Sequence, residues 1–308
     1  MTKAWKEYNK IPAHKKQALK PLNELSGSEW AQLSKSVVEF NGTIARKRKE
    51  HGAAFPFSLA RQIIRTYTIK GDTVLDPFVG VGTTTDAAYL LGREGIGFEI
   101  NSKFYALSLS EVEEVDRSSD DVKNPVKPTI YNKPVSTLRA LIQKESVDLT
   151  LTSPPYSRLL NITIDKFASS NYEKNIYKNS GRKLASPYSQ NTEDLGNMTW
   201  DVYCRNIQKL MNDLMFVSKP GAFNVWVVRD FRDMEEGIPL VNLHGKIIEL
   251  AETAGWILND IVVWNQTNQR KLVKMGGIKS RRFYFNIGHS YILVFRKNVD
   301  GERFHNEH

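Results

Sequence analysis

The chain has 308 residues, of which 41% are hydrophobic, so it is long enough for one large α/β domain or two small ones. Its single cysteine, Cys204, excludes a disulfide framework and a cysteine-rich zinc site. No apolar run reaches about 18 residues and the N-terminus is charged throughout. We therefore expect no membrane-spanning helix, no secretory signal and an intracellular location.

The net charge of +9 is concentrated in two segments. Residues 1–50 hold eleven Lys or Arg against five acids, a run that fits either a polyanion contact or a solvated surface. Residues 265–282 hold six basic residues and no acid, between two predicted strands. Each phosphate that a basic side chain neutralises releases counterions, so the second segment favours a nucleic-acid partner.

From about residue 72 the chain alternates strand and helix patterns, after a basic N-terminal extension (1–54) that we expect to be partly helical. Repeated β-α units imply an α/β fold with a doubly wound, mostly parallel sheet and a site at the carboxyl ends of its strands. The predicted strands are 73–78, 94–100, 129–132, 147–152, 222–229, 256–264 and 290–296. The predicted helices are 83–91, 102–115, 136–144, 199–217 and 243–254.

Two polar segments interrupt this alternation, 157–197 and 265–282. Loops of such length in a compact domain are usually functional or disordered. We therefore assign residues 55–298 to one domain with these two inserts, followed by a short tail at 299–308.

A glycine-rich turn, DPFVGVGTT at residues 76–84, follows the first of these strands and opens a helix. Its glycines let the backbone approach a ligand closely, and its threonines can cap the helix. A P-loop would need a Gly-Lys pair, which is absent, and a dinucleotide-binding turn would prefer glycine where Thr85 stands. S-adenosylmethionine is the third ligand that uses such a turn, and Glu99, at the end of the next strand, is placed to bind its ribose hydroxyls.

The strand 147–152 leads into Ser153-Pro154-Pro155-Tyr156. Proline cannot donate to a strand ladder, so the strand must stop here. The two prolines also stiffen the corner between a serine hydroxyl and a tyrosine ring. Either this corner holds a ligand in place, or it is a turn that only ends a strand.

Five segments together resemble the amino-methylating DNA methyltransferases, which methylate the exocyclic amine of cytosine (N4) or adenine (N6). They are DPFVGVGTT (76–84), GIGFEIN (95–101), TSPPY (152–156), HGAAFPFSL (51–59) and HSYILVFRK (289–297). The resemblance implies a class I, Rossmann-like fold with a seven-stranded sheet and S-adenosylmethionine as cofactor. It assigns cofactor binding to Phe55, Pro56, Asp76, Pro77, Phe78, Gly80, Gly82, Thr83, Thr84, Glu99, Ile100 and Asn132.

The chemistry of this family gives the Ser-Pro-Pro-Tyr motif a catalytic role. An exocyclic amine is a poor nucleophile because its lone pair is delocalised into the ring. If the Ser153 hydroxyl and the Pro154 carbonyl accept hydrogen bonds from the amine N–H groups, that pair is freed; Pro155 fixes the corner and Tyr156 stacks on a flipped-out base. The reaction needs no covalent intermediate and no metal, and His244 and His289 are too scattered to predict a metal site.

The serine at position 153 favours cytosine N4 as the target. Family members with serine there mostly resemble cytosine-N4 enzymes, whereas those with aspartate mostly resemble adenine-N6 enzymes. Adenine N6 remains the alternative. Carbon-5 methylation is disfavoured, because it needs an activated cysteine in a Pro-Cys pair, whereas Cys204 follows a tyrosine on a predicted helix. RNA methylation stays open, as does an inactive relative that binds cofactor or DNA as a regulator.

Double-stranded DNA is the expected partner, and no membrane partner is expected. In a restriction-modification system a cognate endonuclease would act on the same site; an orphan or phage methylase would have none. The inserts 157–197 and 265–282 are the candidates for target recognition. The side chains predicted to bind DNA are Lys174, Lys178, Arg182, Lys183, Arg270, Lys271, Lys274, Lys279, Arg281 and Arg282.

Two positions depart from the family or leave alternatives. Many relatives place an acid after the third strand, where it meets the adenine amine of the cofactor, but residues 130–135 contain none. Asn132 is the acceptor predicted in its place. Asp230, after the strand at 222–229, is either structural or part of the pocket.

Overall fold

The computed structural model describes residues 22–40, 45–51, 54–113, 116–118, 121–122, 126–156, 189, 191–233, 238–269 and 284–299. Within these ranges, no helix has both the length and the apolar character to cross a bilayer.

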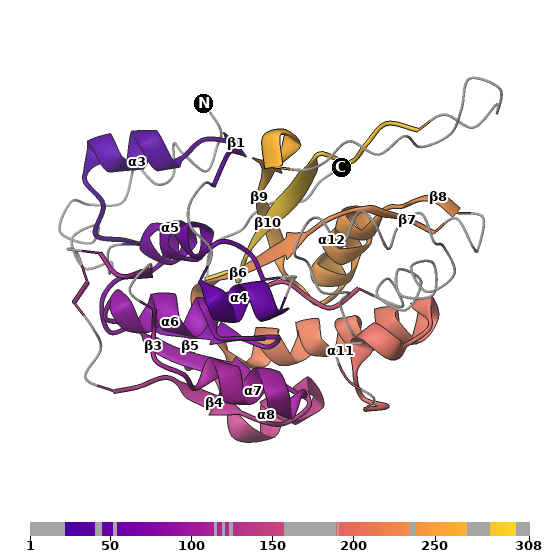
Figure 1. Cartoon of the computed structure of the whole chain (residues 1–308), viewed down its shortest axis with the longest axis horizontal. Coiled ribbons are helices and arrows are strands. Elements are labelled where there is room, and N and C mark those ends of the chain that lie inside the picture. Colours follow the sequence, from indigo (N-terminus) through magenta and orange to yellow (C-terminus); the bar gives the residue numbers. More distant parts are fainter. Residues whose placement is uncertain are drawn as a thin grey trace.

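A central sheet of eight strands runs through the molecule (Figure 1). All neighbouring pairs are parallel except those of β10, which is antiparallel to both β6 and β9. The order is β1 (Val37–Val38), β9 (Ile257–Asn265), β10 (His289–Arg296), β6 (Ser218–Val228), β5 (Val147–Thr152), β2 (Thr73–Asp76), β3 (Glu94–Phe98) and β4 (Thr129–Tyr131). This arrangement confirms the doubly wound, mostly parallel sheet; the strand beyond the predicted seven is β1, from the N-terminal extension.

The strand order reverses between β2 and β5. From β2 the chain builds outward through β3 to β4, then returns to place β5 on the other side of β2. In open α/β sheets, ligands bind in the crevice outside the carboxyl ends of the strands at this switch point. The glycine-rich turn and Ser153 follow β2 and β5, so the fold brings both motifs to the expected crevice.

Helices cover both faces of the sheet (Figure 1). On one face lie α5 (Phe57–Tyr67) and α6 (Thr83–Leu90), whose buried side chains pack with apolar residues of β2, β5, β6 and β10. On the other lie α8 (Leu138–Leu141), α11 (Trp200–Val217) and α12 (Leu243–Thr253). In α11 the buried apolar residues recur every three or four positions, which explains one buried stripe: Tyr203, Ile207, Leu210, Met211, Leu214 and Val217.

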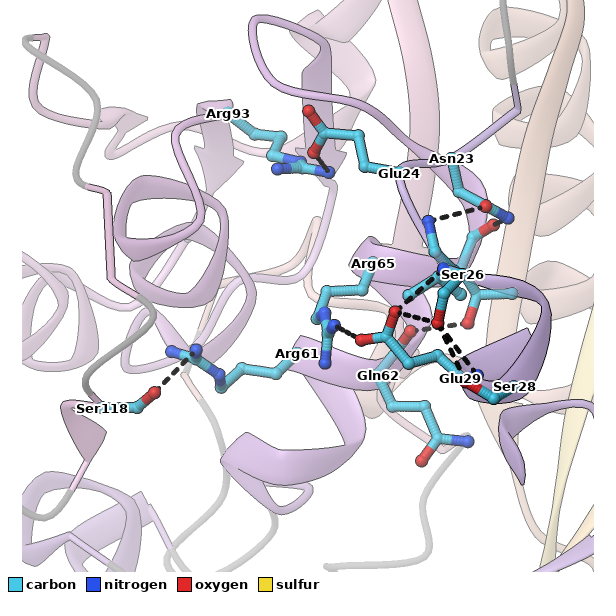
Figure 2. Close-up of polar contacts among 12 residues, drawn as sticks. Asn23, Glu24, Ser26, Ser28, Glu29, Arg61, Gln62, Arg65, Arg93 and Ser118 are labelled. Atoms are coloured by element: carbon cyan, nitrogen blue, oxygen red, sulfur yellow. Dashed lines mark hydrogen bonds and ion pairs between the residues drawn. The ribbon is translucent and has the colours of Figure 1, made fainter. Parts of the chain in front are cut away.

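The N-terminal extension packs against this domain through polar contacts (Figure 2). Ser26 caps α3 (Gly27–Leu33) in a capping box with Glu29, and Glu29 also forms a 2.6 Å ion pair with Arg65 of α5. A second pair joins Glu24 to Arg93 at 3.1 Å. The extension also supplies β1, which pairs with β9 of the central sheet. The predicted domain boundary at residue 54 stays a prediction.

Several short elements were missed or shortened in the prediction. The hairpin of β7 (Phe231–Asp233) and β8 (Ile238–Val241) has no strong strand pattern, and helix α5 was not predicted. The helix expected at 102–115 is α7 (Ser102–Ser108), and the one expected at 136–144 is α8 preceded by the 3₁₀ turn η2 (Val135–Thr137). The remaining short helices are α4 (Arg46–His51), η3 (Leu195–Asn197) and η4 (Thr267–Gln269).

Candidate active site

The glycine-rich turn leaves β2 and enters α6 through residues with left-handed backbone. Gly80 has φ +55°, and a Cβ there would come within 3.0 Å of the His51 ring. The turn is closed by hydrogen bonds from the Val79 amide to the Phe98 carbonyl (3.0 Å) and from the Gly82 amide to the Val79 carbonyl (2.9 Å). Glycine at position 80 therefore provides both the backbone conformation and the space that this turn requires.

Asp76, at the end of β2, holds the glycine-rich turn in place through three hydrogen bonds to its carboxylate. One carboxylate oxygen accepts hydrogen bonds from the Thr152 hydroxyl (2.6 Å) and the Phe78 amide (3.0 Å), and the other accepts from the Thr84 hydroxyl (2.6 Å). Burial raises the pKa of Asp76 to about 6, although these three donors lower it. The carboxylate thus ties the cofactor turn to the last residue of β5.

Glu99, directly after β3, holds the second acid of the site. Its carboxylate accepts from the Asn101 amide at 2.7 Å and also from the Gly80 amide. Burial raises the pKa of Glu99 to about 7, and the nearby acids Asp194 and Asp76 raise it further, against the two amide donors. Because the Glu99 carboxylate is buried and only two amides donate to it, hydroxyl groups of a ligand would stabilise its charged form.

These segments border one pocket at the switch point, with about 940 Å³ of empty space including the part open to solvent. The predicted residues that line it are Phe55, Asp76, Pro77, Phe78, Gly80, Thr83, Glu99, Ile100, Ser153, Pro154, Pro155 and Tyr156. The structure therefore brings the predicted cofactor turn and the predicted catalytic motif together in a single cavity, while the role of each residue stays a prediction.

Four predicted cofactor residues lie behind the pocket lining. Pro56 is the N-cap residue of α5, and Gly82 is the N-cap of α6, packed against Ser108. Thr84 is fully buried and donates to Asp76. Asn132 donates to the Glu99 carbonyl (2.8 Å) and its side-chain oxygen accepts from Ser102 (3.0 Å), so it braces the ends of β3 and β4.

The sequence did not single out several residues of the pocket wall. Glu193, Asp194 and Leu195 come from the end of the first insert; the Glu193 carboxylate accepts from Ser136 at 2.9 Å, and Asp194 accepts from the Gly196 amide at the same distance. No motif or periodicity marks these residues, because their contact with Ser136 in η2 is distant in sequence. The other unpredicted lining residues are His51, Ala54, Val79, Val81, Phe98, Lys133 and Val135.

His51 enters the pocket from α4. Burial lowers its pKa to about 4, so the imidazole is neutral near pH 7, and its ring packs 4.5 Å from that of Phe104. Helix α4 is anchored by two buried ion pairs, Lys47 with Asp86 and Arg48 with Asp116. The HGAAFPFSL segment (51–59) predicts that this part of the chain lines the cofactor pocket, although only Phe55 and Pro56 are assigned from it.

Tyr156 lines the pocket together with the two prolines that precede it. Burial raises the pKa of Tyr156, whereas the positive charge and backbone of Arg229 and a hydrogen bond with the Ser153 side chain lower it. Its ring centroid lies 6.0 Å from that of Phe231. The serine hydroxyl and the tyrosine ring of the motif are thus held against each other at the exit of β5.

Asp230 lies beside this corner but does not line the pocket. Its buried carboxylate accepts from the His244 backbone amide (3.1 Å) and contacts the His244 Nδ1 (2.8 Å). The His244 ring stacks on Tyr291 at 4.0 Å. These contacts favour the structural alternative for Asp230. In the part of the chain that the structure describes, His, Cys, Asp and Glu form no group of three that could hold a metal ion.

All ten side chains predicted to bind DNA lie outside the described residues. They are Lys174, Lys178, Arg182, Lys183, Arg270, Lys271, Lys274, Lys279, Arg281 and Arg282. The assignment of either insert to target recognition therefore stays a prediction.

The fold and the pocket define a Rossmann-like α/β protein with a small-molecule site at the switch point of its sheet. Residues 2–110 match the family model described as DNA methylase. The type II methyltransferase M.MthZI from Methanothermobacter thermautotrophicus is 39% identical over 100 residues, which are 32% of this chain and 27% of that enzyme. The DNA adenine methyltransferase YhdJ from Escherichia coli (strain K12) is 35% identical over 79 residues, 26% of this chain and 27% of YhdJ.

Among solved structures, an S-adenosylmethionine-dependent methyltransferase from Methanosarcina mazei aligns over 77% of this chain and 98% of its own, at 13% identity and a TM-score of 0.44. Over about a third of this chain, these sequence matches support the predicted resemblance to the amino-methylating (N6/N4) DNA methyltransferases. The matches to M.MthZI and YhdJ span about a quarter of each relative, and Ser153–Tyr156 lie beyond the family-model match.

Proposed function

We propose that the protein is a DNA methyltransferase that transfers a methyl group from S-adenosylmethionine to the N4 amine of cytosine. The observation that carries this proposal is the single pocket shared by the glycine-rich turn, Glu99 and the Ser-Pro-Pro-Tyr corner. A cofactor on the turn and a base on the corner would therefore meet at the switch point of the sheet.

The residues present fit the cofactor. The Thr83 hydroxyl is buried in the pocket wall and has no hydrogen-bond partner among the described residues, so a ligand can satisfy it. Glu99 would accept from the ribose hydroxyls, and Gly80 leaves the backbone open to the methionine part. When bound, the cofactor supplies an electrophilic methyl group on a positively charged sulfur.

The corner after β5 would prepare the base. Tyr156 would stack on the flipped cytosine, and Ser153 Oγ with the Pro154 carbonyl would accept hydrogen bonds from the two amine N–H groups. These hydrogen bonds draw the nitrogen lone pair out of conjugation and aim it at the methyl group. After methyl transfer, S-adenosylhomocysteine would leave and the nitrogen would release one proton to solvent. Because both prolines restrict the backbone, the acceptors are positioned before the base arrives, and the rate gain comes from preorganisation.

Adenine N6 is the second candidate target. The serine at position 153 supports cytosine, because a neutral hydroxyl is a weaker acceptor than the carboxylate that adenine-type relatives place there. Support for adenine comes from the similarity to YhdJ, whose name states that specificity. A restriction-modification role, with a cognate endonuclease, is proposed from the relatives named type II methyltransferases.

The proposal is tested by transfer of a tritiated methyl group from S-adenosylmethionine to DNA and, in parallel, to RNA. We expect label in DNA, and a rate reduced roughly 100-fold in Ser153→Ala, the size found when one preorganised polar contact to a reacting centre is lost. Cofactor affinity should stay within about 3-fold in that variant. Labelling of RNA alone, or an unchanged rate in Ser153→Ala, would overturn the proposal.

A further inference from the structure

Three large apolar side chains are exposed on the hairpin β7–β8 and on the chain that leads into β10. Ile238 and Leu240, on β8, are 43% and 48% exposed, and Phe285 is 81% exposed. Scattered exposed apolar residues are normal, but a group of them on adjacent segments marks an interaction surface. Phe285 is the most exposed large apolar side chain in the described part of the chain.

Arg232 fixes these two segments to each other. Its guanidinium donates to the Pro239 carbonyl on β8 and, at 2.8 Å, to the Phe285 carbonyl, and it lies 4.7 Å from the centre of the Tyr284 ring. Figure 1 shows β7–β8 and the chain entering β10 side by side at one end of the molecule. The backbone that presents Phe285 is therefore anchored even though its side chain is exposed.

The same anchor connects Phe285 to the catalytic corner. Arg232 follows Phe231, whose ring lies 6.0 Å from that of Tyr156. Tyr291, six residues after Phe285, pairs with Val228 near the carboxyl end of β6. Phe285 thus belongs to the edge of the sheet where the base would bind.

The charge of the neighbouring sequence identifies the occupant of this surface. Residues 265–282, which end three positions before Phe285, carry six basic side chains and no acid, although most of them lie outside the described residues. A second copy of this chain, with a net charge of +9, would be repelled by such a surface, whereas a polyanion would be attracted. An exposed aromatic ring on a chain of net positive charge suits stacking on the bases of a polyanion.

We infer that Phe285 is a wedge that enters the DNA duplex and stacks where the target base has been flipped out. The inference rests on the proposed function. It adds a residue that lowers the free energy needed to flip the target base out of the duplex. Flipping loses the stacking of the target base on its neighbours, and an apolar side chain inserted at that step replaces part of it. The anchored backbone at Tyr284 and Phe285 lets the ring replace this stacking without first being ordered.

The test uses two duplexes that contain a site methylated by the wild-type protein, located by sequencing DNA exposed to it. One duplex is fully paired, and the other has an abasic position opposite the target base, so flipping costs less. The variants are Phe285→Ala, Phe285→Tyr and, as a control, Leu109→Ala, which removes a 56% exposed side chain that follows α7. The readouts are kcat/KM for methylation and the fluorescence of 2-aminopurine at the target position.

We expect Phe285→Ala to lower kcat/KM at least 10-fold on the paired duplex, with a matching loss of 2-aminopurine signal, and less than 3-fold on the abasic duplex. Phe285→Tyr and Leu109→Ala should stay within 3-fold of wild type on both. Equal losses on the two duplexes, or no loss, would overturn the wedge. A change of sedimentation in Phe285→Ala would overturn it too, in favour of an interface between two copies. If the wild-type protein methylates no DNA, the proposed function itself fails.

Discussion

The hydroxyl of Thr152 donates a 2.6 Å hydrogen bond to the buried carboxylate of Asp76. This contact joins the last residue of β5 to the last residue of β2, across the point where the strand order reverses. Ser153 follows Thr152 directly, and the glycine-rich turn follows Asp76. Together with the pairing of β2 and β5, this hydrogen bond fixes the position of the proposed catalytic corner relative to the proposed cofactor turn.

Thr152→Val should damage both halves of the site, because it keeps the shape of the side chain but leaves a buried carboxylate oxygen with one donor fewer. We expect a loss of about 1–3 kcal/mol in the free energy of unfolding and weaker binding of S-adenosylhomocysteine. Urea unfolding and calorimetry measure the two effects. Thr150→Val is the matched control, because the buried Thr150 hydroxyl on the same strand has no hydrogen-bond partner among the described residues. If both variants lose equal stability, the Asp76 contact has no special role.

Cofactor affinity should depend on the ionisation of Glu99. Its pKa is raised from 4.5 to about 7 in the free protein, and ribose hydroxyls bind the ionised carboxylate, so binding releases a proton. Affinity for S-adenosylhomocysteine should therefore rise about 10-fold from pH 6 to pH 8 and level off above. Titration calorimetry at several pH values checks this. In Glu99→Gln we expect weak binding with a flat pH profile; a rise equal to that of wild type would exclude Glu99 as its cause.

The same raised pKa predicts how folding stability changes with pH. Between the unfolded value of 4.5 and the folded value of about 7, the folded protein holds a proton on Glu99 that the unfolded chain has released. The free energy of unfolding should therefore fall as pH rises through this range. Glu99→Gln should gain stability relative to wild type by on the order of 1–3 kcal/mol from pH 4 to pH 8. A constant difference between the two proteins would contradict the raised pKa.

A comparison of Gly80→Ala with Gly71→Ala distinguishes the effect of backbone strain from the steric effect of an added Cβ in the pocket wall. Gly80 and Gly71 both have positive φ, +55° and +84°, but a Cβ at Gly80 meets the His51 ring at 3.0 Å while one at Gly71 meets nothing within 4 Å. Gly71→Ala should therefore cost about 1 kcal/mol in stability and leave cofactor binding intact. Gly80→Ala should cost more and weaken cofactor binding at least 10-fold, since it displaces the pocket wall. Equal cofactor binding in the two variants would remove Gly80 from the site.

Tyr156 should affect the base and not the cofactor. Tyr156→Ala removes the ring proposed to stack on the flipped base, a contribution of roughly 1–3 kcal/mol, so the methylation rate should fall by about 10- to 100-fold while S-adenosylhomocysteine binds as before. Tyr156→Phe keeps the ring and loses only the hydroxyl that contacts Ser153, so its rate should fall less. Should cofactor affinity fall in parallel with the rate, the ring would belong to the cofactor wall instead.

The sequence predicts the middle of the sheet well because β2, β5, β6 and β10 are largely buried apolar runs. Asp76 ends β2, and Glu99 and Ser153 follow β3 and β5 of a parallel sheet, so their convergence could be foreseen from the alternation alone. The hairpin β7–β8 could not be foreseen, because its short strands carry exposed residues such as Ile238 and Leu240 and show no alternation.

The missed part of the site comes from segments far away in sequence. Glu193 reaches the pocket through a hydrogen bond to Ser136, and no local pattern encodes a contact across 57 residues. The predicted acceptor Asn132 is adjacent to the right strand end, but its side chain is bonded to the Glu99 carbonyl and to Ser102. Such competition between polar partners depends on packing, which the sequence pattern does not specify.

The most direct test of the account is mass spectrometry of nucleosides from DNA that has been incubated with the purified protein and S-adenosylmethionine carrying a deuterated methyl group. We predict deuterated N4-methylcytosine, absent from the reaction with Ser153→Ala. Deuterated N6-methyladenine would keep the pocket and the chemistry but show that Ser153 does not select cytosine. If no deuterated base is formed on DNA of varied sequence, the claim that this pocket methylates DNA is contradicted.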